Sequence, residues 1–394
     1  MSYRVNPAFK YELRKFGIDE QWNECFHCGN CTAQCPLTEE EFLFPRNGIR
    51  NMQLGLQKKL VANVDPWLCY YCGDCTDTCP RDANPGELMM TLRRYLTSKY
   101  DWTGISKKFY TSHWWETTAI IVIAIMVIAA FMIYLPLKPG ASTMINDSGG
   151  VMINSLVEGF SATQFVRIIE IGDWIMALLV AILLISNILN MFYKVILNDG
   201  SLKVPPRSYF TEFWKLIYNF ITQAGFSKCN DRTYWVGHLL LMTGYTIMFI
   251  LVVVALPMFQ TEEVVVWYNW QRILGYYATT GIILFLIIVS IGRIRRKEAK
   301  LKFSHPSDWL FIIMLGLTTI TGILVHLFRI NGMVAATYYM YVLHLAVLVP
   351  MILIEVPFSK WSHLAYRPFA IYFSKLKKAA LREKEFQREL APAI

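Results

Sequence analysis

Residues 25–36, CFHCGNCTAQCP, and residues 69–80, CYYCGDCTDTCP, decide how this chain folds. Each run has the spacing Cys-x2-Cys-x2-Cys-x3-Cys-Pro, and the two runs hold eight of the nine cysteines. This spacing is typical of proteins with two [4Fe–4S] clusters, in which the fourth cysteine of each run binds the cluster of the other run. We therefore predict that cluster 1 is held by Cys25, Cys28, Cys31 and Cys79, and cluster 2 by Cys69, Cys72, Cys75 and Cys35.

Two other uses of these cysteines fit the sequence less well. A disulfide framework needs an oxidising compartment, whereas the topology argued below places this segment in the cytoplasm. Structural zinc sites use pairs of cysteines and not triplets with a trailing Cys-Pro. Gly29 and Gly73 stand between the second and third ligands of each run, where the backbone must pass close to a cluster.

Helical periodicity flanks both cysteine runs and predicts an all-α fold. We expect helices within residues 1–24 and 44–60, and a third that opens at Asn84–Glu87 and runs to residue 100. Without a pattern for β-hairpins, the cysteine region is predicted to adopt an α-helical ferredoxin arrangement. Met1–Lys15 is charged and has no apolar core of the length that a signal peptide needs.

Six apolar segments follow, each close to the roughly 20 residues that cross a bilayer. They are predicted at about 117–137, 172–195, 235–256, 273–292, 307–328 and 338–358. Lys and Arg gather in the loops after the second and fourth spans and after the sixth, which places both termini in the cytoplasm and the protein in the cytoplasmic (inner) membrane. The stripe of aromatic and aliphatic residues at 208–224 predicts a helix lying in the interface, with a seventh span as the alternative.

Histidines near the span ends predict haem b, because an ionisable residue within a span is usually functional and paired neutral imidazoles can hold haem iron. His238 and His363 lie at similar depth near the cytoplasmic side and form the predicted inner pair. His344 and His326 lie near the outer side and form the outer pair, with Met248 as the alternative to His326.

The remaining histidines are expected to have ordinary roles. His113 stands beside two tryptophans and is predicted to lie at the interface, while His27 and His305 are predicted to be exposed. We thus predict three regions: a cytoplasmic dicluster [4Fe–4S] ferredoxin-like domain at 1–110, a transmembrane cytochrome b domain at 111–365 and a basic cytoplasmic tail at 366–394.

The segments CFHCGNCTAQCP, PRNGIRNMQLG and WLCYYCGDCTDTCPRDANPGELMMTLRRYL resemble the C subunit of heterodisulfide reductases. In span order and histidine placement, the membrane half resembles the haem b subunit of respiratory nitrate reductase and its heterodisulfide reductase counterpart. The fusion of the two resembles the membrane subunits of quinone-interacting membrane-bound oxidoreductase (Qmo) complexes. In the nitrate reductase type one span carries two histidines ten residues apart; here the first is His238 and the second position holds Met248.

The resemblance implies electron exchange between menaquinone or another quinone, haem b, two [4Fe–4S] clusters and cytoplasmic flavin and Fe–S subunits of the Qmo or heterodisulfide reductase type. In the Qmo case these partners serve adenylylsulfate reductase, in anaerobic respiration or sulfur metabolism. The chain shows no G-x-G-x-x-G fingerprint and leaves only Cys229 unassigned. It is therefore predicted to be a quinone-reactive subunit of an oxidoreductase and not a complete enzyme, with no nucleic-acid partner.

Other functions were weighed against this one. The close alternative is the membrane arm of a heterodisulfide reductase-like complex. A redox-sensing protein or a transporter is the rival from another class, but a transporter predicts inverted repeats, and none is evident between the first and last three spans. Glu355, the clear acid within a span, is a weak candidate for accepting a quinol proton, and the alternative is that it reaches the interface. The sequence locates no quinone pocket and sets no direction of electron flow.

Overall fold

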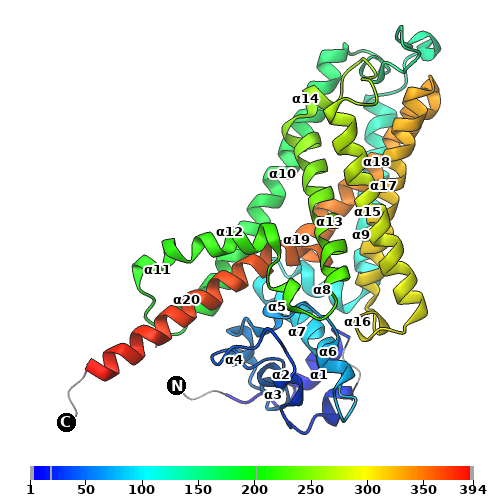
Figure 1. The fold of residues 1–394 in the computed structure, drawn as a ribbon. Coiled ribbons are helices and arrows are strands. Elements are labelled where there is room, and N and C mark those ends of the chain that lie inside the picture. Colours follow the sequence, from blue (N-terminus) through cyan, green and yellow to red (C-terminus); the bar gives the residue numbers. More distant parts are fainter. Residues whose placement is uncertain (1–3, 18–19, 201, 391–394) are drawn as a thin grey trace.

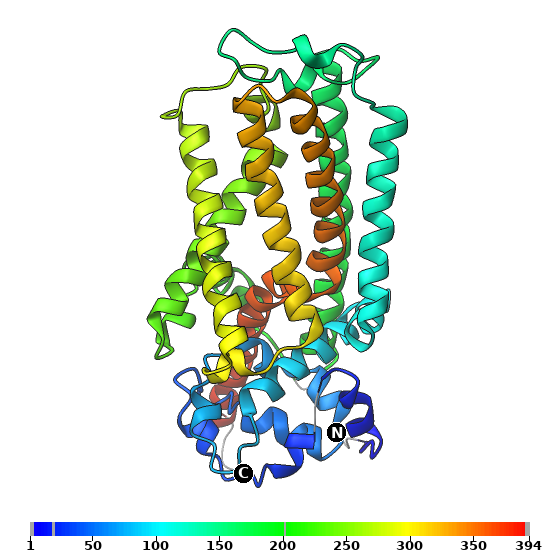
Figure 2. The ribbon, with the colours of Figure 1, turned by 90° about the vertical axis from the view of Figure 1, so that its right-hand side faces the viewer.

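The computed structural model describes residues 4–17, 20–200 and 202–390. Throughout these ranges the regular secondary structure is helical, with only isolated bridges of β type, so the all-α prediction is confirmed. A small domain with both cysteine runs packs against one end of a bundle of long helices (Figures 1 and 2). We call this end of the bundle the proximal end and the opposite end the distal end.

Short helices build the cysteine domain. They are α1 (Phe9–Arg14), η1 (Glu20–Glu24), α2 (Asn30–Ala33), α3 (Arg46–Gln53), α4 (Gln57–Val61), α5 (Asp65–Leu68), α6 (Asp74–Asp77), α7 (Pro85–Tyr100) and α8 (Ile105–Thr111). The predicted helix at 44–60 is broken into α3 and α4 because the chain turns at Gly55, whose φ is 65° and where a Cβ would lie 2.4 Å from the Asn6 carbonyl oxygen. The long helix α7 begins after Asn84, as predicted.

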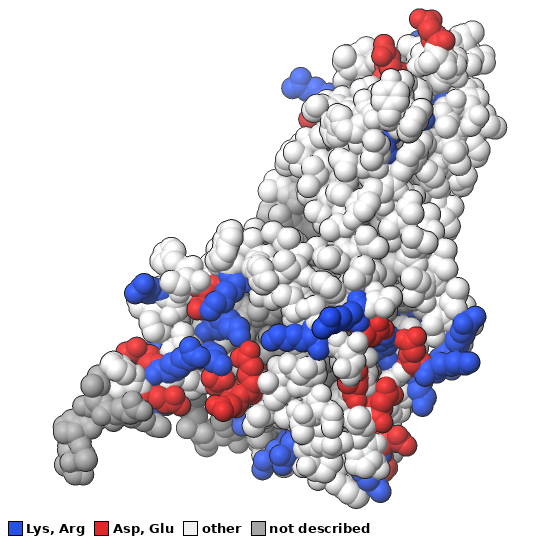
Figure 3. All heavy atoms as spheres, viewed as in Figure 1, with Lys and Arg blue, Asp and Glu red and all other residues white. Residues whose placement is uncertain are grey.

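Six helical segments in the described residues are long and apolar enough to cross a membrane, which confirms the predicted number. They comprise α9 (His113–Tyr134), α10 (Ala162–Phe192) with the π-helical turn η4 (Tyr193–Leu197), α13 (Arg232–Phe249) with η6 (Ile250–Val254), α15 (Trp270–Arg295), α17 (Pro306–Ile330), and α18 (Val334–Pro350) with η7 (Met351–Glu355) and α19 (Val356–Phe358). The second begins ten residues before its predicted start, because polar residues of its first turns hid the helix from the hydropathy pattern. The bundle presents an almost uncharged band between charged ends (Figure 3).

Shorter elements connect these helices. They are η2 (Ala141–Thr143), η3 (Ile153–Ser155), α11 (Pro206–Thr211), α12 (Phe213–Thr222), η5 (Phe226–Lys228), α14 (Leu256–Phe259), α16 (Ala299–Lys302) and η8 (Lys360–Ser362). The predicted interfacial helix at 208–224 is therefore two helices, α11 and α12, which leave the bundle sideways at its proximal end (Figure 1). Their apolar residues remain exposed, Phe210 by 84% and Trp214 by 70%, as expected of side chains that face lipid.

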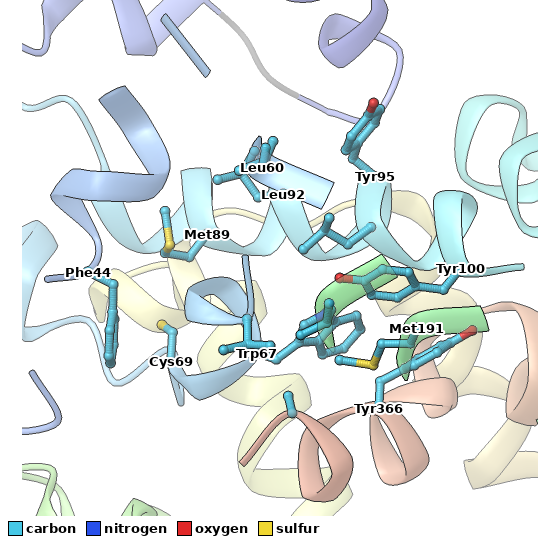
Figure 4. Close-up of a cluster of buried hydrophobic side chains, with 14 of the residues drawn as sticks. Phe44, Leu60, Trp67, Cys69, Met89, Leu92, Tyr95, Tyr100, Met191 and Tyr366 are labelled. Carbon is cyan, nitrogen blue, oxygen red and sulfur yellow. The ribbon is translucent and has the colours of Figure 1, made fainter. Parts of the chain in front are cut away.

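The last helix, α20 (His363–Leu390), joins the two halves of the protein. It runs across the predicted boundary between residues 365 and 366, and its Tyr366 and Leu376 are fully buried in the core of the cysteine domain. Met191 of α10 enters the same core, beside Trp67 (Figure 4). The cysteine domain is thus anchored to the bundle by shared apolar packing. Residues 391–394 of the predicted tail lie outside the described residues.

Candidate redox site

The two cysteine runs adopt the same backbone shape. His27 and Tyr71, at matching positions, have φ values of 58° and 57°, and the following Gly29 and Gly73 have φ values of 88° and 96°. A helix of four residues, α2 or α6, then begins directly after each glycine. Glycine is favoured at such φ values because it has no Cβ to clash with the backbone. The repeat in the sequence is therefore a repeat in structure.

The fold gathers the eight cysteines into two groups of four. Burial raises the pKa of the Cys25 thiol, and the nearby Cys79 and Cys28 raise it further. Burial likewise raises the pKa of Cys35 to about 11, with contributions from Cys69 and Cys72. Cys79 thus lies with the first run and Cys35 with the second, the exchange that the predicted cluster assignment requires.

We call Cys25, Cys28, Cys31 and Cys79 group 1, and Cys69, Cys72, Cys75 and Cys35 group 2. Within the described ranges no three potential ligands surround a single metal ion. A [4Fe–4S] cluster is larger than one ion and takes one thiolate on each of four irons. Two groups of four thiols are the donor set that two such clusters need, and the ligand assignment stays a prediction.

The two groups have opposite surroundings. In group 1 Cys28 is exposed, and the neighbouring Phe26 is 69% exposed with the Arg81 guanidinium 4.4 Å from its ring centroid. In group 2 Cys69 and Cys75 are buried. A Cβ on Gly73 would lie 3.1 Å from the Ala299 Cβ of α16, so the loop of group 2 touches the bundle. Group 1 therefore faces outward and group 2 faces the membrane helices.

The predicted inner histidines meet at the proximal end of the bundle. The ring centroids of His238 and His363 are 6.4 Å apart. With metal–nitrogen bonds of about 2.0 Å and about 1.1 Å from nitrogen to ring centre, two imidazoles on one iron have centroids about 6 Å apart. The Nδ1 of His238 lies 2.8 Å from Gln223 Oε1, and the Nδ1 of His363 lies 2.7 Å from the Lys360 carbonyl oxygen. These acceptors hold the Nδ1 protons and leave both Nε2 atoms free to bind iron, so the pair fits a haem b.

Aromatic rings connect group 2 with this histidine pair. Tyr70, next to Cys69, stacks on Phe226 with a centroid distance of 5.1 Å, and Phe226 meets the His238 ring at 5.8 Å. From the other side, the Arg367 guanidinium lies 4.5 Å from the Tyr70 ring centroid and donates to the Cys69 carbonyl. Phe226, Gln223 and Arg367 were not among the predicted site residues. Of the three, only Arg367 could have been found from the sequence, because it lies one helical turn after His363.

Cys229, the cysteine without a predicted role, lies beside group 2. Its side chain is buried together with Tyr70 and Phe226. A hydrogen bond with the Cys229 thiol lowers the pKa of Cys72. Cys229 is thus placed to donate to the sulfur of a predicted cluster ligand, a type of contact that tunes cluster potentials.

The predicted outer histidines make separate contacts. The Nδ1 of His344 lies 3.0 Å from Thr321 Oγ1 on α17. The Nε2 of His326 lies 2.9 Å from the Tyr276 hydroxyl on α15. No contact between the two rings is found in the described part of the chain, and Met248 lies half-buried on α13. The outer haem and its ligands stay a prediction.

Three other predicted positions differ from expectation. Glu355 is fully buried, so the alternative that it reaches the interface is wrong. His305 is half-buried and caps α17 by accepting the Ser307 N–H at Nδ1. Burial, with the charge of Arg94, lowers the pKa of His305 to about 3. His27 is half-buried and not exposed as predicted. His113, by contrast, is exposed at the start of α9, where its ring packs against Trp114.

Comparison with known proteins supports the cysteine half. A family model described as a 4Fe-4S dicluster domain matches residues 21–83, a range that includes both cysteine runs. No curated protein and no solved structure matches the chain. The match and the six apolar helices define an iron–sulfur membrane protein of the electron-transfer class.

Proposed function

We propose that the chain is a membrane subunit that exchanges electrons between the menaquinone pool, through haem b, and cytoplasmic flavin and Fe–S partners, through two [4Fe–4S] clusters. The observation that carries the proposal is the His238–His363 pair and its ring contact with the loop of group 2. The soluble partners are of the kind found in Qmo complexes that serve adenylylsulfate reductase.

The residues around the inner pair have defined tasks in this proposal. A haem b on His238 and His363 supplies one-electron exchange. Gln223 and the Lys360 carbonyl fix the orientation of the two imidazoles. Tyr70 and Phe226 fill the space between group 2 and His238, so packed side chains would separate a haem held by His238 from cluster 2.

The surroundings of the two cysteine groups indicate which cluster would lie next to the haem and which would lie next to a soluble partner. Cluster 2 is the neighbour of the haem, while cluster 1 lies near the exposed Phe26 and Arg81, where a soluble partner can approach. Lys and Arg gather at the proximal end (Figure 3), and this distribution favours a cytoplasmic location for the cysteine domain and both termini.

A groove of about 800 Å³ at the distal end is the candidate quinone site. Apolar residues such as Trp174 and Leu178 of α10 line one part, and Arg167 and Gln260 line another. A quinone has an isoprenoid tail and a polar headgroup, so this division suits it. The Tyr341 hydroxyl donates to Gln260 Oε1 and links the groove to α18, one turn before His344.

A reduced-minus-oxidised optical spectrum of the purified chain, with haem and iron quantified, tests the proposal. We expect b-type bands and about eight non-haem irons per chain. The His363→Ala variant should lose one haem and keep the electron paramagnetic resonance signals of both clusters, whereas the matched control His113→Ala should keep every cofactor. Absence of b-type bands from the wild-type protein would refute the membrane half of the proposal.

A further inference from the structure

Two carboxyl groups are buried next to each other at the proximal end of the bundle. Glu116 of α9 and Glu355 of η7 are both 0% exposed. Their side chains are close enough to interact electrostatically. The Ser359 hydroxyl donates a hydrogen bond to Glu116 Oε1. Glu116, which lies in the first turn of its helix, was not among the predicted site residues.

This pair has too few partners to carry two charges. Neither carboxylate oxygen of Glu355 accepts a hydrogen bond of normal geometry, although the Ser359 hydroxyl and the Lys360 N–H lie near them, and Glu116 Oε2 has no partner. The Lys360 ammonium group, which acts electrostatically on Glu355, is paired with Asp308. Burying a charge without compensation is costly, and two adjacent carboxylates in such a site cannot both ionise. At least one proton is therefore held between Glu116 and Glu355.

The other ionisable groups that face the pair do not neutralise it. Tyr110 of α8 faces both carboxyl groups, and burial raises its pKa above the usual range, so the phenol stays protonated. Asp308 of α17 also faces Glu116, and it is engaged by Arg94, Arg293 and Lys360.

A short, hydrogen-bonded turn ties the pair to the inner histidines. The Ser359 N–H donates to the Glu355 carbonyl oxygen over 3.3 Å, and the His363 ring binds the Lys360 carbonyl oxygen over 2.7 Å. An extra electron on a haem held by His363 would add negative charge at the end of the bundle where the two carboxyl groups lie. Negative charge nearby favours the protonated form of a carboxyl group.

We propose that Glu116 and Glu355 form a redox-linked proton-accepting site. With one more electron on a haem held by His238 and His363, one proton from the proximal side would bind a carboxylate oxygen of the pair; once that electron has left, the O–H bond would break and the proton would return to the proximal side. Each electron on the iron is thus matched by one proton, and the buried site keeps its net charge. This inference rests on the proposed function, since it needs the haem on His238 and His363.

Potentiometric titration of the purified, cofactor-loaded chain at several pH values tests it. The inner haem is identified as the b-type band that is lost in His238→Ala. Its midpoint potential in the wild-type protein should fall by about 59 mV per pH unit over part of the range, the equivalent of a tenfold change in proton concentration for one electron. Glu116→Gln/Glu355→Gln should bind the same haem and lose this slope, whereas Glu158→Gln, in an exposed loop, should keep it.

A second measurement does not depend on the variants' potentials. Redox-difference infrared spectra of the wild-type protein should contain a protonated-carboxyl band that disappears in the double variant. A b-type haem whose midpoint is independent of pH, or a slope that survives in the double variant, would overturn the proton site alone. Absence of any b-type band would overturn the proposed function together with this inference.

Discussion

Asp308 lies at the seam between the cysteine domain and the bundle, and its charge is predicted to hold the two together. It sits in the first turn of α17, with its carboxylate 3.6 Å from Arg94 of the cysteine domain and 3.8 Å from Arg293 of α15. It also pairs with Lys360. Asp308, Arg94 and Arg293 are all buried. The Asp308→Asn variant would keep the shape of the side chain and leave three cations with one carboxylate fewer.

The expected loss is large because the partners stay buried. Removing one member of a buried ion pair costs about 3–5 kcal/mol, since the remaining charge is left without compensation. Arg94 keeps a second carboxylate partner, Glu87, at 3.1 Å, which favours the lower end of that range. An exposed pair offers the matched control: Arg81→Ala removes the contact with Glu24, whose side chain is 53% exposed, and the stacking on exposed Phe26, and should cost about 0–1 kcal/mol.

Denaturant unfolding of the detergent-solubilised protein, followed by tryptophan fluorescence, measures both losses. Limited trypsin digestion should in addition release the cysteine domain of Asp308→Asn faster than that of the wild-type protein, because the seam opens more often. If Asp308→Asn loses no more stability than Arg81→Ala, the buried ion cluster does not hold the seam and the reasoning fails.

Three further predictions concern the relay, the docking loop and acid stability. Phe226→Leu should slow electron transfer between cluster 2 and the inner haem in stopped-flow measurements while leaving the haem spectrum unchanged; an unchanged rate would exclude the ring path. Gly73→Ala and Gly29→Ala should each lower the free energy of unfolding by about 1–2 kcal/mol, because both positions have a left-handed backbone. Gly73→Ala should cost more, because its Cβ meets α16 at 3.1 Å while that of Gly29 meets only the flexible Arg46 side chain. Equal losses of stability would contradict the contact between the Gly73 loop and α16. The fold lowers the pKa of His305 to about 3, so on acidification the unfolded chain binds a proton at His305 before the folded chain does. The stability of the folded state should therefore fall as pH drops from about 6.5 towards 3. Thermal unfolding of His305→Gln should show a shallower fall with pH, and a pH dependence identical to that of the wild-type protein would refute this role of His305.

The sequence predicted the features that depend on local pattern. Cysteine spacing located both binding loops, hydropathy located six long helices, and matching depth selected His238 and His363, whose rings do meet. Gln223 and Phe226 were not found because they lie in a loop whose contact with the third long helix depends on tertiary packing. The predicted tail proved to be a docked helix for a similar reason: its basic residues signalled solvent, while Tyr366 and Leu376 on the same helix pack into the cysteine domain.

The two cysteine loops share a backbone shape but have opposite neighbours, and this has an evolutionary consequence. Residues around Gly73 are constrained by the bundle, whereas Phe26 beside group 1 is 69% exposed and Arg81 contacts Phe26 and Glu24 of its own domain. In the proposed function a soluble partner approaches at these two positions, so substitutions there would alter docking and leave the contact of Gly73 with α16 as it is. If the proposed function holds, choice of partner and coupling to the membrane could therefore evolve independently within this one small domain.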